Sequence, residues 1–140
     1  YFKRDKYEVA GQSINLYELE HELILPLEEP RIHFAIVCAS TSCPVLRSEA
    51  YVPERLDEQL DDAARGFIND TQRNQFDLDN GVARISRIFD WFEQDFEVDG
   101  RSLQQYLAVY VTDPQVAAAL EQDGLRVKHL KYDWSLNGRK

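Results

Sequence analysis

The chain has 140 residues, of which 44% are hydrophobic and 29% are charged, and its formal net charge is -9. This length and composition suit one domain with a hydrophobic core and are short for two. The negative charge disfavours binding to nucleic-acid phosphates or to an anionic membrane surface, so neither nucleic acid nor membrane is an expected partner. No segment approaches the roughly 18 consecutive apolar residues of a membrane span.

The N-terminal part predicts a strand followed by a helix. Residues 7–10 form a short β-like run that ends at Gly11. Asn15 is followed three residues later by Glu18, a capping-box pattern that marks the start of a helix. Leucines at helical spacing follow, and Pro26 is the expected end of this helix.

Residues 32–38 predict a strand. The run is apolar except for His33, as in strands that are buried on both faces. Alternation places Cys38 on one face of this strand and His33 on the other. A loop of small residues follows over residues 39–44, and Cys43 lies near its end.

Turn and cap residues divide the second half into helices, a hairpin and a closing strand. Pro53 is a favoured first helical residue, and apolar residues at 3.6 spacing continue from it to Phe67. Asp79-Asn80-Gly81 between two β-like runs predicts a hairpin. Further helices are expected to begin near Ser86, Ser102 and Asp113, and the closing strand is expected over residues 125–134.

The order of these elements predicts an α+β fold, in which a small sheet with one strand buried on both faces is covered by several short helices. The aromatic residues of segment 88–92 recur at helical spacing and are expected in the core. The acidic residues of segment 54–65 are expected to form a solvated helix face or, alternatively, a surface for a protein partner. The visible strands are few for a doubly buried strand, and the chain starts at Tyr1 and contains no methionine. We therefore expect one domain over residues 1–140 that lacks its N-terminal part.

The segment 31–44 carries the groups that suggest chemistry, because a buried strand there leads into a loop with a thiol at each end. Pro44 at a first helical position would make Cys43 the N-cap, where the helix dipole and free N–H groups favour the nucleophilic thiolate. The alternatives for Cys43 are an ordinary loop thiol or a disulfide with Cys38. Cys38, in apolar surroundings, is expected to be a core thiol with a raised pKa, or the resolving partner of a reactive Cys43.

A thiol nucleophile needs a base, and the candidates for this role are His21, His33 and His129. His33 reaches Cys43 only if the loop folds back over its face of the strand; otherwise it is a core histidine bonded to a backbone carbonyl. Arg31 can bind a substrate carboxylate or, as we prefer, anchor the acidic residues 28–29. The hydroxyl of Ser42 can hydrogen-bond an oxyanion.

Several motifs occur in an order that resembles a known family. They are LYELEHELI, RIHFAIVCASTSCPVLRSEAY, ERLDEQLDDAARGFIND, RISRIFDWFEQDF and the closing YDWSLN. Together they resemble the bacterial and plant family called domain of unknown function 547, over residues 7–137. This resemblance implies a distant relationship to thiol hydrolases of the papain and transglutaminase type. It also implies that the family's histidine falls on His33, its paired cysteines on Cys38 and Cys43, and the aspartate of its last motif on Asp133.

Members of this family carry an upstream helix with a Trp-Asn-x-Tyr-Asn-Ala-like motif, at the place where related thiol hydrolases have their nucleophile. No such motif occurs in this chain. The resemblance thus implies that an N-terminal helical part is missing, and that this part is a candidate partner. Family members often carry export signals, so we favour the bacterial periplasm over the cytoplasm.

Two functions remain open. The first is a cysteine-dependent hydrolase or acyltransferase that acts on a small peptide or amide, with Cys43 as nucleophile and His33 as base. Asp133 would orient the histidine, and loop amides near Ser42 and Cys43 would form an oxyanion hole. The second is a non-catalytic domain that binds a small peptide or a thiol-containing ligand, with Cys38 and Cys43 joined in a disulfide or inert. Neither function needs a metal or a cofactor, and none is expected.

Overall fold

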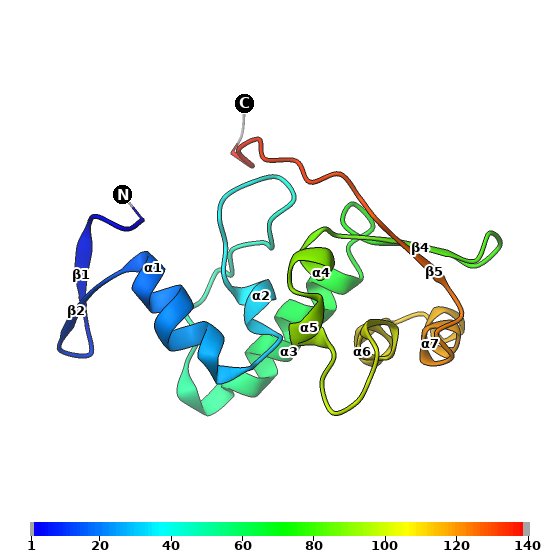
Figure 1. The fold of residues 1–140 in the computed structure, drawn as a ribbon, viewed down its shortest axis with the longest axis horizontal. Coiled ribbons are helices and arrows are strands. Elements are labelled where there is room, and N and C mark those ends of the chain that lie inside the picture. Colours follow the sequence, from blue (N-terminus) through cyan, green and yellow to red (C-terminus); the bar gives the residue numbers. More distant parts are fainter. Residues whose placement is uncertain (1, 139–140) are drawn as a thin grey trace.

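The computed structural model describes residues 2–138. Within them the chain forms an α+β fold with seven α-helices and two small sheets, one of two strands and one of three (Figure 1). This confirms the predicted fold class. No helix among the described residues is both long and apolar enough to cross a membrane.

The first described elements form a hairpin. β1 (Lys6–Val9) pairs antiparallel with β2 (Gln12–Asn15). Ala10 and Gly11 connect the strands, and both have the positive φ that a two-residue hairpin turn requires. β1 confirms the predicted strand within one residue, whereas the polar sequence of β2 gave no strand signal.

The predicted capping box is present at the start of the first helix. The Asn15 side chain accepts a hydrogen bond from the Glu18 amide at 2.8 Å, and the Glu18 carboxylate accepts one from the Asn15 amide at 2.9 Å. The helix consists of α1 (Leu16–Glu18), the π-helix η1 (Leu19–Ile24) and the 3-10 helix η2 (Leu25–Leu27). Pro26, the predicted end of the helix, lies inside η2. The helix therefore runs past it and ends at Glu28, whose backbone is left-handed with a φ of 54°.

The predicted strand at residues 32–38 is wrong. Its first half forms α2 (Ile32–Ala35), a single helical turn, and the rest pairs with no named strand among the described residues. The Ile36 amide donates to the Ile32 carbonyl at 2.9 Å, so the segment satisfies part of its backbone locally. Three of the four side chains of α2 are buried. A short apolar run fits such a buried helical turn as well as it fits a strand.

Most helix starts of the second half are confirmed. The helices are η3 (Pro53–Arg55), α3 (Leu56–Ile68), α4 (Ile88–Trp91), α5 (Glu93–Phe96), α6 (Leu103–Tyr110) and α7 (Pro114–Glu121). Pro53 opens the short turn that leads into α3, and the side chains of Ser102 and Asp113 cap α6 and α7. The helix expected after Ser86 is broken into α4 and α5 at Phe92.

The second sheet contains the predicted hairpin. β3 (Gln75–Asp77) and β4 (Val82–Ile85) pair antiparallel, with Gly81 in the turn at a φ of 61°. β5 (Arg126–His129) adds to β4 in parallel and gives the strand order β3-β4-β5. β5 is shorter than the strand expected over residues 125–134. The chain beyond it continues without regular structure towards the loop of residues 39–44, which we call the thiol loop.

Aromatic side chains join these elements into one core. Phe34 of α2 packs against Phe67 of α3 with ring centroids 5.1 Å apart, and Phe89 of α4 packs against Phe96 of α5 at 4.9 Å. α3 packs against α2 and α6, and α6 packs against α5 and α7 (Figure 1). Phe89 confirms the aromatic core predicted for its segment, whereas Trp91 is 43% exposed and does not.

Candidate functional site

A cavity of about 270 Å³ lies where the first helix, α2, α4 and the C-terminal segment meet. Its walls carry both cysteines, Cys38 and Cys43, together with His33, Glu20 and Tyr132. The fold thus brings three of the predicted site residues, the two thiols and the histidine, to one cavity. Tyr132 joins them from the motif of the predicted site residue Asp133, and Glu20 joins them from a helix that the sequence did not connect with the site.

Cys38 is the more exposed of the two thiols and the more acidic. Its Sγ lies 3.2 Å from the Ser40 hydroxyl and 3.6 Å from the Tyr132 hydroxyl. Burial raises the pKa of the Cys38 thiol, but hydrogen bonds from Ser40, Cys43 and Tyr132 outweigh it and lower the pKa from 9.0 to about 7. The Cys38 thiol therefore ionises more readily near neutral pH than an ordinary cysteine. This is the opposite of the core thiol with a raised pKa that the sequence predicted.

Cys43 has the contrary character, and the prediction of an N-cap thiolate is wrong. Pro44 starts no helix; residues 44–52 form a loop, and the next helix begins at Pro53. The Cys43 residue is only 2% exposed, and burial, followed by its hydrogen bond with Cys38, raises the pKa of its thiol. Its Sγ accepts a hydrogen bond from the Cys38 amide at 2.8 Å. Both thiols are free, so the disulfide considered from the sequence is not formed in this structure.

His33 is buried and pairs with an aspartate that the sequence did not single out. Its Nε2 lies 2.8 Å from the Asp95 carboxylate, and its ring stacks on Phe92 with centroids 4.1 Å apart. Burial lowers the pKa of His33, and the hydrogen bond to Asp95 opposes this only in part. The ring is therefore neutral at pH 7. The Asp95 contact assigns the proton to Nε2, which leaves Nδ1 as the acceptor.

The C-terminal segment holds the loop between the two thiols. The Thr41 amide donates to the Ser135 carbonyl at 2.8 Å, and the Ser42 amide donates to the Asp133 carbonyl at 3.3 Å. In return, the Asp133 amide donates to the Ser42 hydroxyl at 2.9 Å. In Figure 1 this segment, drawn in red, runs back towards the cyan loop. The loop is therefore fixed by a segment that is distant in sequence.

These contacts change two expected roles. The Asp133 carboxylate accepts from the Ser135 amide at 2.9 Å, whereas His33 is held by Asp95. The amides of Ser42 and Cys43 already donate to backbone carbonyls, so they are not free to form the expected oxyanion hole. What Ser42 and Asp133 do in the structure is hold the thiol loop in place.

The thiol loop and its histidine lie in the part of the chain that a family comparison recognises. Residues 1–68 match the family model described as "Protein of unknown function, DUF547". The DUF547 match contains His33, Cys38 and Cys43, ends with α3, and leaves Asp95 and Tyr132 outside it. It supports the DUF547 resemblance over those residues only. No curated protein and no solved structure matches the chain.

Within the DUF547 match, Arg31 is fully engaged by acidic side chains. Its guanidinium binds the carboxylates of Glu29 at 2.7 Å, Asp57 at 2.9 Å and Asp61 at 3.0 Å. The hydrogen bond to Glu29 is the largest of the effects that raise the pKa of Arg31. The structure thus shows the anchoring contact preferred from the sequence, and it extends this contact to the acidic face of α3. Arg31 does not line the cavity.

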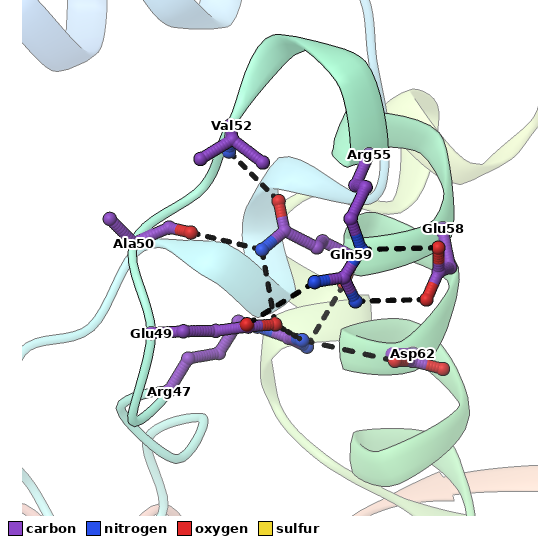
Figure 2. Close-up of polar contacts among 8 residues, drawn as sticks. All are labelled: Arg47, Glu49, Ala50, Val52, Arg55, Glu58, Gln59 and Asp62. Carbon is purple, nitrogen blue, oxygen red and sulfur yellow. Dashed lines mark hydrogen bonds and ion pairs between the residues drawn. The ribbon is translucent and has the colours of Figure 1, made fainter.

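A buried glutamine at the other side of α3 fixes the loop that follows the thiols. The Nε2 of Gln59 donates to the Ala50 carbonyl at 2.9 Å, and its Oε1 accepts from the Val52 amide at 2.9 Å. Figure 2 shows these bonds and the neighbouring ion pairs, among them Arg47 with Glu49 at 2.9 Å. Sequence reasoning missed Gln59, because a polar residue in an acidic helix is expected to face solvent.

One wall of the cavity is aromatic. The rings of Trp91 and Trp134 stack with centroids 5.6 Å apart, and the ring centroid of Tyr132 lies 4.5 Å from that of Trp134. Both tryptophans remain exposed, at 43% and 66%. Such a wall suits an apolar or aromatic group beside the thiols. Among residues 2–138, no group of three or more histidine, cysteine, aspartate or glutamate side chains is placed to hold a metal ion.

Proposed function

We propose that this chain is a cysteine-dependent hydrolase or acyltransferase acting on a small peptide or amide, with Cys38 rather than Cys43 as the nucleophile. The observation that carries the proposal is the state of Cys38. It is an exposed thiol with a pKa of about 7, in the same cavity as a neutral histidine that is held by an aspartate. A thiolate, a base and a group that orients the base are what nucleophilic thiol catalysis requires.

Each of these residues has one role in the reaction. The Cys38 sulfur attacks the substrate carbonyl carbon, and the C–N bond of the amide breaks to leave a thioester on Cys38. Nδ1 of His33 passes the thiol proton to the departing amine, while Asp95 holds the Nε2–H. Water or a second amine then attacks the thioester and restores the thiol.

Tyr132 supplies the oxyanion donor in place of the occupied loop amides. In the resting site the Ser40 hydroxyl hydrogen-bonds the Cys38 thiolate; as the sulfur passes its charge to the substrate, this hydroxyl donates instead to the Tyr132 oxygen 3.0 Å away, and the phenol proton is free for the developing oxyanion. Burial raises the pKa of Tyr132, so the phenol keeps this proton at neutral pH. One donor aimed at an oxyanion typically contributes about 3 kcal/mol to the transition state.

A distant relationship to thiol hydrolases of the papain and transglutaminase type belongs to the same proposal. It is supported by the set of Cys38, His33 and Asp95, which resembles the Cys-His-Asn arrangement of papain-like proteases. The aromatic wall formed by Trp91 and Trp134 suggests that the group next to the reacting bond is apolar or aromatic.

A non-catalytic binding domain is the second candidate, and the occupied loop amides favour it. With the N–H groups of Ser42 and Cys43 engaged, an oxyanion depends on Tyr132 alone. In this case a small peptide or a thiol-containing ligand lies against the aromatic wall, and no bond is broken.

Turnover of an activated ester separates these two functions. With p-nitrophenyl acetate, the wild type is expected to release a burst of nitrophenol equal to the protein concentration, followed by steady turnover. Cys38→Ser should abolish both phases. Cys43→Ala is the matched control at the neighbouring thiol: it should keep the burst but need a higher pH, because it removes one hydrogen bond that lowers the Cys38 pKa.

His33→Gln distinguishes catalysis from simple thiol reactivity. This variant should keep the burst, since an activated ester acylates any accessible thiolate, and lose roughly tenfold or more of the steady rate. A wild type that is acylated once and then stops supports the binding domain instead. Equal turnover in Cys38→Ser contradicts the enzymatic proposal outright.

A further inference from the structure

The loop places the two thiols as a pair. The Cys38 amide donates to the Cys43 sulfur at 2.8 Å, and the Cys43 thiol hydrogen-bonds the Cys38 sulfur. The turn between them is built into the backbone: Ala39 is left-handed with a φ of 60°, and the Cys43 amide donates to the Ser40 carbonyl at 3.1 Å. One sulfur is therefore held beside the other in the reduced protein.

We propose that Cys38 and Cys43 are a reversible, peroxide-reactive pair, in which a hydroperoxide oxidises Cys38 and Cys43 then closes a disulfide with it. The roles follow from exposure. Both thiols line the same cavity, but Cys38 is exposed, whereas Cys43 is only 2% exposed. A hydroperoxide from solution therefore meets Cys38 first, and Cys43 reacts with a group already attached to the protein.

The steps balance with a hydroperoxide as the oxidant. The Cys38 thiolate attacks one oxygen of hydrogen peroxide and the O–O bond breaks, so the sulfur is oxidised to a sulfenic acid and the peroxide is reduced to hydroxide. The Cys43 sulfur then attacks the Cys38 sulfur. The S–S bond forms, the S–O bond breaks, and the Cys43 proton leaves with the hydroxyl group as water. An added dithiol restores both thiols by exchange.

The surrounding groups suit this division of roles. The hydroxyls of Ser40 and Tyr132 stabilise the Cys38 thiolate from 3.2 Å and 3.6 Å. The buried Cys43 keeps its proton until the sulfenic acid is present, because its pKa is raised. The disulfide would occupy the nucleophile of the proposed acyl transfer and so switch that reaction off, but the pair itself does not depend on the acyl transfer.

Hydrogen peroxide with dimedone, a reagent that traps sulfenic acids, tests the pair in the whole protein. In the wild type, peroxide should consume both free thiols and link the Cys38 and Cys43 peptides within one molecule, as seen by mass mapping. Dithiothreitol should restore both. In Cys43→Ser the sulfenic acid should persist, and dimedone should label Cys38. In Cys38→Ser, Cys43 should stay unmodified.

The rate gives a second test. Oxidation of Cys38 should speed up about tenfold between about pH 6 and pH 8, as the thiolate forms around a pKa of about 7. Thr41→Val is the matched control in the same loop, since the Thr41 hydroxyl contacts Ser135 of the C-terminal segment; the oxidation rate of this variant should be unchanged. If Cys43→Ser does not fold, dimedone present during oxidation of the wild type traps the same sulfenic acid.

Three results would overturn the proposal. They are disulfides that join two protein molecules, dimedone on Cys43 instead of Cys38, and direct oxidation of wild-type Cys38 to the sulfinic acid. None of these readouts involves ester turnover, so a failed acyl-transfer test leaves them intact.

Discussion

Replacing Ser40 with alanine tests the origin of the Cys38 thiolate. Ser40 is buried, and its hydroxyl lies 3.2 Å from the Cys38 sulfur. Of the groups that lower the Cys38 pKa, this hydroxyl has the largest effect, ahead of the Cys43 thiol and Tyr132. Ser40→Ala deletes the hydroxyl and leaves the Ser40 amide, which also donates to the sulfur.

The size of the effect follows from one hydrogen bond to a charged sulfur. Such a bond contributes about 1.5–3 kcal/mol, and about 1.4 kcal/mol corresponds to one pKa unit. Because Cys38 is exposed, solvent screens part of this energy, and the lower end of the range applies. We therefore expect the Cys38 pKa to rise by roughly one unit from its value of about 7. Tyr132→Phe removes a longer contact, at 3.6 Å, and should give a smaller rise.

A pH titration of the ultraviolet absorbance of thiolate measures this shift. The wild type should show a lower step near pH 7 for Cys38 and an upper step above 9.0 for Cys43. Ser40→Ala should move the lower step upwards, while Thr41→Val, in the same loop, should leave it in place. An unmoved lower step in a folded Ser40→Ala protein refutes the assignment of the thiolate to these hydroxyl donors.

Three further predictions concern stability. Burial lowers the pKa of His33 below 6.5, so His33 binds a proton more tightly in the unfolded chain than in the folded protein. The free energy of unfolding should therefore fall as the pH drops below about 6.5, and fall less in His33→Gln, when urea unfolding is followed at several pH values. Gln59→Leu leaves the Val52 amide and the Ala50 carbonyl without their side-chain partner and should lower the free energy of unfolding by about 2 kcal/mol in the same assay. Glu58→Gln, on the exposed face of the same helix, should change this free energy little. Asn15→Ala removes the first helix cap and should cost about 1 kcal/mol; an unchanged urea midpoint would show that the cap is not needed.

The parts of the fold that the sequence predicted are those whose chemistry is local. The capping box at Asn15, the helix start at Ser102 and the turn around Gly81 depend on residues no more than three positions apart. A short side chain that accepts a bond from a nearby amide marks a helix start whatever the rest of the chain does. The segment 32–38 had no such marker, and its apolar pattern fits a buried strand and a buried helical turn equally well.

The site could be predicted only in part, because its chemistry depends on distant contacts. The sequence located His33 and both cysteines, but it placed the reactive thiol at Cys43 by assuming a helix after Pro44 that the structure does not have. The partner of His33 lies 62 residues away, and one of 25 acidic residues had to be chosen without any local signal. The Tyr132 hydroxyl that helps to acidify Cys38 lies 94 residues from it.

The claim that Cys38 is the reactive thiol is tested most directly by alkylation of each cysteine in the reduced wild type. Iodoacetamide is applied over a range of pH, and the two cysteine peptides are quantified separately by mass spectrometry. Cys38 should reach half of its maximal rate near pH 7, and Cys43 should stay unreactive until the protein is unfolded. A Cys43 that reacts first, or a Cys38 that titrates like a free thiol at about pH 8.5, contradicts the proposed nucleophile and the proposed redox pair together.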